Sequence, residues 1–129
     1  MQTALFIGLG SFCGGVLRHL GGQLVRQWVG AGSLFPWHTL CINALGCLLL
    51  GLLNGLFERG DAPLHPDLRA ALSVGLCGGF TTFSTFAGEN IALLRQGALL
   101  QGGAYTALSL LGGLALFLLG YLTTKSILS

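Results

Sequence analysis

One short segment places hydroxyl groups and aromatic rings inside a run that is otherwise apolar. Residues 75–89 read GLCGGFTTFSTFAGE, with hydroxyls at Thr81, Thr82, Ser84 and Thr85. A segment that only faces lipid is expected to hold Leu, Ile and Val, because polar groups there need partners. Hydroxyls can donate to an anion or satisfy backbone groups that a helix has released. The segment therefore predicts an ion site, and the alternative is a packing helix whose hydroxyls satisfy its own backbone.

A glycine pair precedes these hydroxyls. Gly78 and Gly79 weaken a helix, because glycine has a low helix propensity. Non-helical backbone at membrane depth is tolerated only where it is buried in protein or lines a watery cavity. We therefore predict an interrupted helix within residues 75–89. Where the helix resumes, its periodicity places Phe83, Phe86 and Asn90 on one face.

Other polar side chains lie within apolar runs, and each allows two interpretations. Thr39 and Asn43 share a helical face, and Asn43 either faces a pathway, which we favour, or bonds a neighbouring helix. Arg18 is either an anion attractor in an aqueous vestibule or a residue that snorkels to the headgroups. Glu89 is either a pathway residue or the interfacial end of its span.

A further polar row occurs near the end of the chain. Tyr105 and Ser109 are spaced at i and i+4, and Gly113 continues the row without a hydroxyl. The row is either part of a polar track or a site of ordinary hydrogen bonding between helices.

The composition is that of a membrane protein. The chain has 129 residues, of which 53% are hydrophobic and 8% charged, and its mean hydropathy is +0.79. Because about 20 apolar residues cross a bilayer, we predict an all-α integral membrane protein with one four-helix domain over residues 1–129. The expected spans are residues 3–26, 37–57, 68–95 and 104–123. A net charge of +2 gives no reason to expect a nucleic acid partner.

Two further expectations concern chemistry and processing. The four cysteines form no CxxC pair, so we expect them to pack as small hydrophobic residues. The chain shows no nucleophile with a base, no nucleotide-binding loop and no metal cluster, which argues against an enzyme. Residues 1–3 carry no basic side chain and the first apolar run ends without a small-residue cleavage site, so we expect no cleaved signal peptide.

Positive charge is balanced between the two ends of the predicted spans. One end collects Arg59, Arg69 and Lys125, and the other collects Arg26, Arg95 and, if it is counted, Arg18. The positive-inside rule therefore gives no clear orientation. A chain of this kind is expected to insert in both directions, so that two inverted copies can pair about a twofold axis.

Together these residues resemble the Fluc (CrcB) family of fluoride channels over essentially the whole chain. The resemblance rests on residues 75–89, on HTLCINALGCLLLG at 38–51 and on GGVLRH at 14–19. It implies an antiparallel, dual-topology homodimer in a bacterial plasma (inner) membrane, with two fluoride pores at the dimer interface. It also implies a central structural Na⁺ held by the backbone carbonyls of Gly78 and Thr81.

The resemblance also assigns roles to individual side chains. Phe83 and Phe86 match the pore wall, and Asn43 matches the pore asparagine. A polar track beside the pore is implied for four residues, namely Thr39, Glu89, Tyr105 and Ser109. Ser84 is grouped with the pore residues, and Arg18 with the vestibule. Gly113 lacks the hydroxyl expected where the track continues.

Elementary chemistry agrees with fluoride as the partner ion. Fluoride is small and strongly hydrated, so removal of its water needs compensating donors such as an amide, hydroxyls and positively polarised ring edges. Two other classes remain: a proton-coupled exporter that uses Glu89, and a structural subunit that only packs against other helices. Proton-dependent uptake would identify the exporter, and absence of flux would identify the structural subunit.

Overall fold

The computed structural model describes residues 1–58 and 64–127, and the regular structure of this part of the chain is entirely helical. Helix α1 spans Gln2–Val29 and α2 spans Trp37–Glu58. The third rod consists of four pieces: α3 (Pro66–Ala70), the π-helical η1 (Ala71–Cys77), α4 (Gly78–Phe80) and α5 (Phe83–Arg95). The fourth consists of α6 (Leu99–Ala107), the π-helical η2 (Leu108–Gly112) and α7 (Gly113–Ile127).

The four rods contain 22 to 30 residues each and are long and apolar enough to cross a membrane. This confirms the expected all-helical class with four spans. The largest difference in bounds is at the fourth rod, which begins at Leu99, whereas the predicted span begins at residue 104. Gly102 there lies against Asn90 and Leu93 of α5, so residues read as a loop instead pack on the preceding helix. Residues 59–63 of the predicted polar loop, with Arg59, lie outside the described residues.

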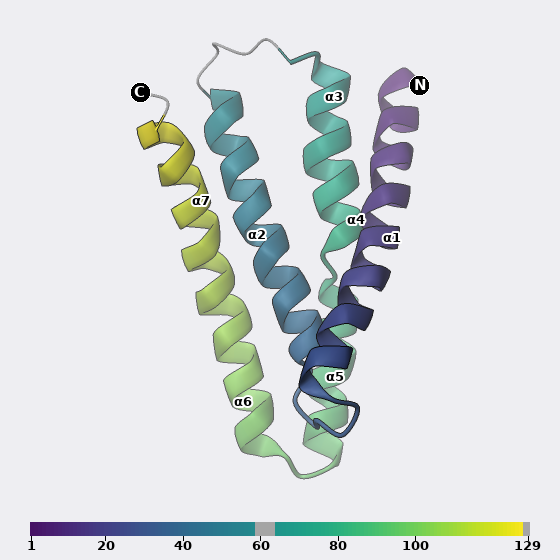
Figure 1. Ribbon diagram of the computed structural model, residues 1–129, viewed down its shortest axis with the longest axis vertical. Coiled ribbons are helices and arrows are strands. Elements are labelled where there is room, and N and C mark those ends of the chain that lie inside the picture. Colours follow the sequence, from purple (N-terminus) through teal and green to yellow (C-terminus); the bar gives the residue numbers. More distant parts are fainter. Residues whose placement is uncertain (59–63, 128–129) are drawn as a thin grey trace.

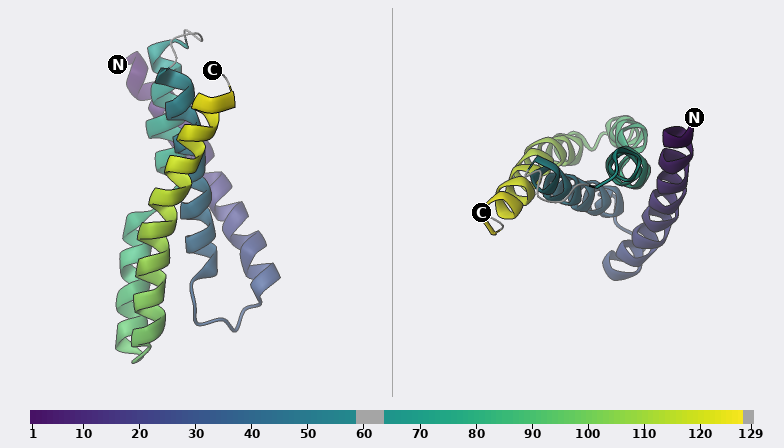
Figure 2. Two further views of the ribbon diagram at one scale, coloured as in Figure 1. Left: turned by 90° about the vertical axis from the view of Figure 1, so that its left-hand side faces the viewer. Right: turned by 90° about the horizontal axis from the view of Figure 1, so that it is seen from above.

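The rods run alternately up and down, and both termini lie at the same end of the bundle (Figure 1). The connections over residues 30–36 and 96–98 lie at the opposite end. Viewed from above, α1 lies at one side, α6 and α7 lie at the other, and α2 and the third rod lie between them (Figure 2). Gly30 and Gly97 have φ values of 87° and 74°, a conformation that glycine adopts without the penalty other residues incur, and each terminates a helix.

Glycines set the two closest helix contacts. A Cβ at Gly10 would lie 2.2 Å from the Ala71 carbonyl oxygen, and one at Gly51 would lie 2.1 Å from the Phe117 carbonyl oxygen. The first contact joins α1 to the third rod, and the second joins α2 to α7. Small residues allow backbones to approach in this way, and the resulting van der Waals contact holds membrane helices together.

The single chain has little interior. Between 6% and 22% of the residues in the apolar windows of the four rods are buried. Large apolar side chains such as Phe12, Leu100 and Leu114 are exposed. Since these side chains need an apolar surrounding, the bundle is suited to lipid or to a second copy of itself.

Candidate functional site at the interrupted third helix

The third rod is interrupted at Thr81 and Thr82, midway along the bundle (Figure 1). Thr81 has φ −84° and ψ 159°, and Thr82 has φ −151° and ψ 116°, so both residues are extended. The third helix is therefore interrupted within residues 75–89, as predicted, but after the glycine pair: Gly78 has helical angles of −65° and −38° and Gly79 lies within α4. Gly79 instead allows close packing, since a Cβ there would lie 2.5 Å from the Ser11 carbonyl oxygen.

Asn43 of α2 pairs with the backbone at the break. Its Nδ2 donates to the Thr82 carbonyl oxygen at 3.1 Å, and its Oδ1 accepts from the Thr82 N–H at 2.8 Å. In a continuous helix that N–H would donate to the carbonyl of Gly78. The Asn43 amide therefore replaces a helical hydrogen bond, releases the Gly78 carbonyl and stabilises the extended conformation.

Neighbouring side chains support the same interruption. Thr82 caps α5, because its hydroxyl accepts from the Thr85 N–H at 3.2 Å. The Thr81 hydroxyl donates to the Cys77 carbonyl at 2.9 Å. Room for the Thr81 methyl group comes from Gly46, where a Cβ would lie 2.2 Å from Thr81 Cγ2. The interruption is therefore set by contacts between α2 and the third rod.

A pocket of about 200 Å³ opens beside the break. Asn43, Cys47, Thr82, Phe83 and Ser109 are among the residues that line it. The Ser109 hydroxyl is buried and has no hydrogen-bond partner within residues 1–58 and 64–127. It is a donor that remains available to a molecule or ion entering the pocket.

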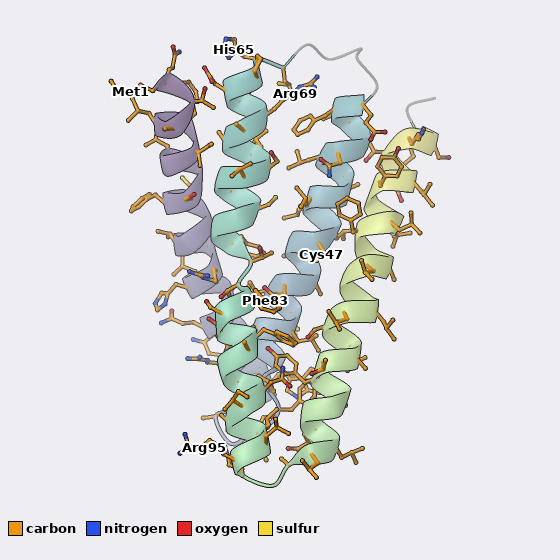
Figure 3. The ribbon with its side chains drawn as sticks, turned by 180° about the vertical axis from the view of Figure 1, so that it is seen from behind. Met1, Cys47, His65, Arg69, Phe83 and Arg95 are labelled. Carbon is orange, nitrogen blue, oxygen red and sulfur yellow. The ribbon has the colours of Figure 1, made fainter. Side chains whose placement is uncertain are left out.

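Phe83 and Phe86 contribute the aromatic part of the pocket. Their ring centroids are 5.6 Å apart, and the Phe86 ring lies 5.0 Å from that of Tyr105. Phe83 lies at the start of α5, next to the break (Figure 3), and is 76% exposed in the single chain. The pocket thus has one aromatic wall and an open side. Phe80, in contrast, is 7% exposed and belongs to the core.

The polar residues of the predicted track meet at Glu89. Thr39 Oγ1 donates to Glu89 Oε1 at 2.8 Å, and the Tyr105 hydroxyl donates to Glu89 Oε2 at 2.7 Å. The carboxylate therefore lies between α2 and α6 and is not a free interfacial end. Ser109 lies in the π-helical η2 and, among the described residues, makes no hydrogen bond to this group. Gly113 is buried against α2, where a Cβ built on it would lie 3.3 Å from the Cys47 sulfur.

Arg18 extends toward the break on its other side. Its Nη1 lies 3.4 Å from the Thr81 carbonyl oxygen, and it lines a pocket of about 320 Å³ with Thr39, Thr82 and Thr85. Arg18 therefore reaches the backbone of the break from a pocket between α1, α2 and α5. Ser84 is exposed, with its Oγ 3.4 Å from Thr82 Oγ1.

Sequence reasoning missed three residues close to this site. His38 and Arg26 contact one another, and His38 also contacts Glu89. Phe35 packs its ring edge against Tyr105, with centroids 5.6 Å apart. His38 could have been found as a titratable residue directly before Thr39, whereas the loop position of Phe35 gives no such signal.

Comparison with known proteins agrees with this architecture. The family model described as CrcB-like protein, Camphor Resistance (CrcB), matches residues 5–121. A protein of Thermus thermophilus named fluoride-specific ion channel FluC is 44% identical over 94% of both chains. Proteins with the same name from Flavobacterium psychrophilum and Chlorobaculum tepidum are 39% and 41% identical, over 98% and 97% of this chain and 100% and 96% of theirs. With four apolar spans and relatives matched end to end, this integral membrane protein belongs to the CrcB family.

Proposed function

We propose that the chain forms a passive fluoride channel through which cytoplasmic fluoride leaves the cell across the bacterial inner membrane, thereby reducing fluoride toxicity. One observation carries the proposal: available donors and phenylalanine rings gather around a helix break in a chain whose relatives bear the name fluoride-specific ion channel. Donors that attract without trapping are what conduction requires.

The proposed path uses the pocket beside the break and the polar group behind it. Ser109 supplies a hydroxyl that has no hydrogen-bond partner among the described residues, and the second N–H of the Asn43 amide is not needed for the Thr82 carbonyl. Phe83 and Phe86 supply ring edges, whose positive polarisation offsets part of the dehydration. Thr39 and Tyr105 hold Glu89, and the Tyr105 ring packs against that of Phe86.

Two inverted copies would complete this path. The pocket is open on one side and Phe83 is mostly exposed, so a single chain provides only part of a wall. A homodimer in which the copies are inverted would pair the two breaks about a twofold axis and give two pores. Charge balance supports both orientations, because Arg69 and Lys125 are at the terminal end and Arg26 and Arg95 are at the other.

The same arrangement provides oxygens for a structural Na⁺. The Gly78 carbonyl loses its helical donor to Asn43, and a Cβ at Gly78 would meet nothing within 4 Å. In the part of the chain that the structure describes, the Thr81 carbonyl has only a long contact with Arg18, at 3.4 Å. Carbonyl oxygens suit a hard cation, and such an ion would clamp the copies together. A density map of the dimer with direct helix contact at Gly78 and no ion would contradict this role.

The decisive test is ion efflux from liposomes containing the purified protein. Loaded fluoride should leave rapidly while chloride is retained, without any imposed proton gradient. Equal rates for the two ions would refute selectivity, and absence of flux would leave a structural subunit. Strict dependence on a proton gradient would instead support the exporter.

Orientation has a separate test. Reporters fused to the C-terminus should be found on both sides of the membrane at native expression. Added lysines in the 58–67 loop should favour one orientation and lower the amount of functional dimer. A single orientation of the unmodified protein would refute dual topology.

A further inference from the structure

A cluster of ionisable side chains lies where two pockets meet. The pocket that contains Arg18 and a second pocket of about 450 Å³, beside the 30–36 connection, are both lined by Arg26 and His38. Glu89 lines the second of them. The side chains of His38 and Glu89 are 24% and 21% exposed, so water and ions can reach them from the pockets.

One nitrogen of His38 faces two partners of opposite kind. Its Nε2 lies 3.0 Å from Arg26 Nη2 and 3.2 Å from Glu89 Oε1. A guanidinium can only donate, and an ionised carboxylate can only accept. A ring nitrogen carries either a proton or a lone pair, so it can satisfy one of these partners at a time.

We propose that His38 is a positioning residue for Glu89 and that its Nε2 selects between Arg26 and Glu89 according to whether it carries a proton. The inference rests on the proposed function, because its effect on flux requires a fluoride path past Glu89. The selection itself is a property of the three side chains and can be measured without flux.

The two states differ in charge and in the support given to Glu89. Without a proton, Nε2 accepts from Arg26, and Glu89 Oε1 keeps its bond from Thr39 alone. When the ring gains its second proton and becomes an imidazolium, Nε2 donates to the same oxygen and releases Arg26. The imidazolium then adds one positive charge to the wall of the pocket that holds Arg18.

The surrounding charges determine the direction of the expected effect. The ionisable groups around His38 in the described chain come from three helices: Arg18, His19 and Arg26 of α1, Glu89 of α5, and, through Glu89, Tyr105 of α6. Arg18 and Arg26 on α1 are positively charged, so an added positive charge on His38 strengthens an anion-attracting wall. Fluoride entry from dilute solution should therefore increase as His38 gains its proton.

The flux experiment compares the parent with His38→Gln at pH 5.5 and pH 7.5. Fluoride efflux from liposomes at low fluoride, after subtraction of the leak from protein-free vesicles, should rise about threefold on acidification in the parent. In His38→Gln the rise should disappear. His65→Gln is the matched control, because His65 lies at the opposite end, beside Asp67, and its replacement should leave the rise intact. Parallel pH profiles for the parent and His38→Gln would overturn the inference.

The second measurement determines which ring nitrogen of His38 carries the proton. In ¹⁵N-histidine-labelled full-length protein, the neutral ring should carry its proton on Nδ1, leaving Nε2 to accept from Arg26. Arg26→Met keeps an unbranched apolar stem but removes the donor, so only the Glu89 acceptor faces Nε2. The neutral ring should then carry its proton on Nε2. An unchanged tautomer would overturn the selection. A tautomer change in a protein with no fluoride efflux would leave the selection standing and reject the proposed function.

Discussion

Helix α2 contacts one neighbour through glycines and another through a polar side chain. Toward α7 it presents Gly51 and Gly55, and the backbones approach so closely that a Cβ at either position would collide with a carbonyl oxygen. Toward the third rod it presents Asn43, whose amide bonds both backbone groups of Thr82. The α2–α7 contact is held by close backbone packing, whereas the contact of α2 with the third rod is held by polar groups beside an open pocket.

The difference shows how a small membrane protein separates structure from function. A continuous helix satisfies its own backbone hydrogen bonds, so a neighbouring helix needs only small residues to pack closely against it. An interrupted helix releases N–H and C=O groups, which need polar side chains from its neighbour. Those polar side chains are also the ones that an ion can use. Substitution of the polar side chain that contacts the third rod should therefore reduce conduction, whereas substitution of the glycines that contact α7 should reduce stability.

The largest effect is expected from Asn43→Asp. An ionised aspartate cannot donate to the Thr82 carbonyl, and it places a negative charge beside the proposed path. Two like charges about 4 Å apart repel by about 4 kcal/mol at the effective dielectric of a partly buried site, so fluoride efflux should fall at least roughly a hundredfold. Liposome efflux measures the result. Asn43→Ser retains one donor without the charge and should lose less. If both variants conducted like the parent, Asn43 would be a packing residue only.

A smaller effect, confined to stability, is expected at the close contact between α2 and α7. In Gly51→Ala the new Cβ would lie 2.1 Å from the Phe117 carbonyl oxygen, so α2 and α7 must separate. Overpacking of this kind costs about 1–3 kcal/mol. The thermal unfolding midpoint in detergent should fall.

Gly103→Ala is the matched control for this substitution. A Cβ at Gly103 of α6 would meet nothing within 4 Å, and alanine favours a helix over glycine by about 1 kcal/mol. The unfolding midpoint should therefore stay the same or rise. If Gly51→Ala behaved in the same way, close packing would not be what holds the α2–α7 contact.

The smallest effect is expected from the aromatic wall beside the polar contact. Phe83→Ile and Phe86→Ile keep apolar bulk but remove the ring edge, an interaction in the range of about 0.5–1.5 kcal/mol. Fluoride efflux should therefore fall roughly twofold to tenfold. Phe→Met should be milder, because the polarisable sulfur replaces part of the ring contribution.

Phe80→Ile separates packing from conduction at this wall. Phe80 is buried beside Gly46, with Cδ1 3.3 Å from a Cβ built there, so its replacement should cost about 1–1.5 kcal/mol of stability and little efflux. Intact protein carrying Phe83→Ile or Phe86→Ile with undiminished efflux would show that these rings only pack.

The sequence by itself determined the class of the protein and pointed to most of the polar residues that the structure gathers around the break. Apolar runs of about 20 residues specify four spans, because an uncharged helix of that length is stable in lipid. Asn43, Arg18 and Glu89 were identifiable because polar side chains in such runs need partners. The existence of a break was also predictable, since a cluster of hydroxyls at membrane depth signals backbone that requires compensation.

Only the tertiary structure decided where the break lies and what each polar group bonds. Gly78 and Gly79 remain helical because α1 and α2 supply the contacts that fix the local backbone: Gly79 packs on Ser11, and Asn43 draws the Thr82 N–H out of the helix. The choice of His38 Nε2 between two partners was likewise hidden, because those partners come from helices 12 and 51 positions away in the sequence. Local sequence determines how well a helix can form, but the place where it opens depends on which neighbour can bond the groups it releases.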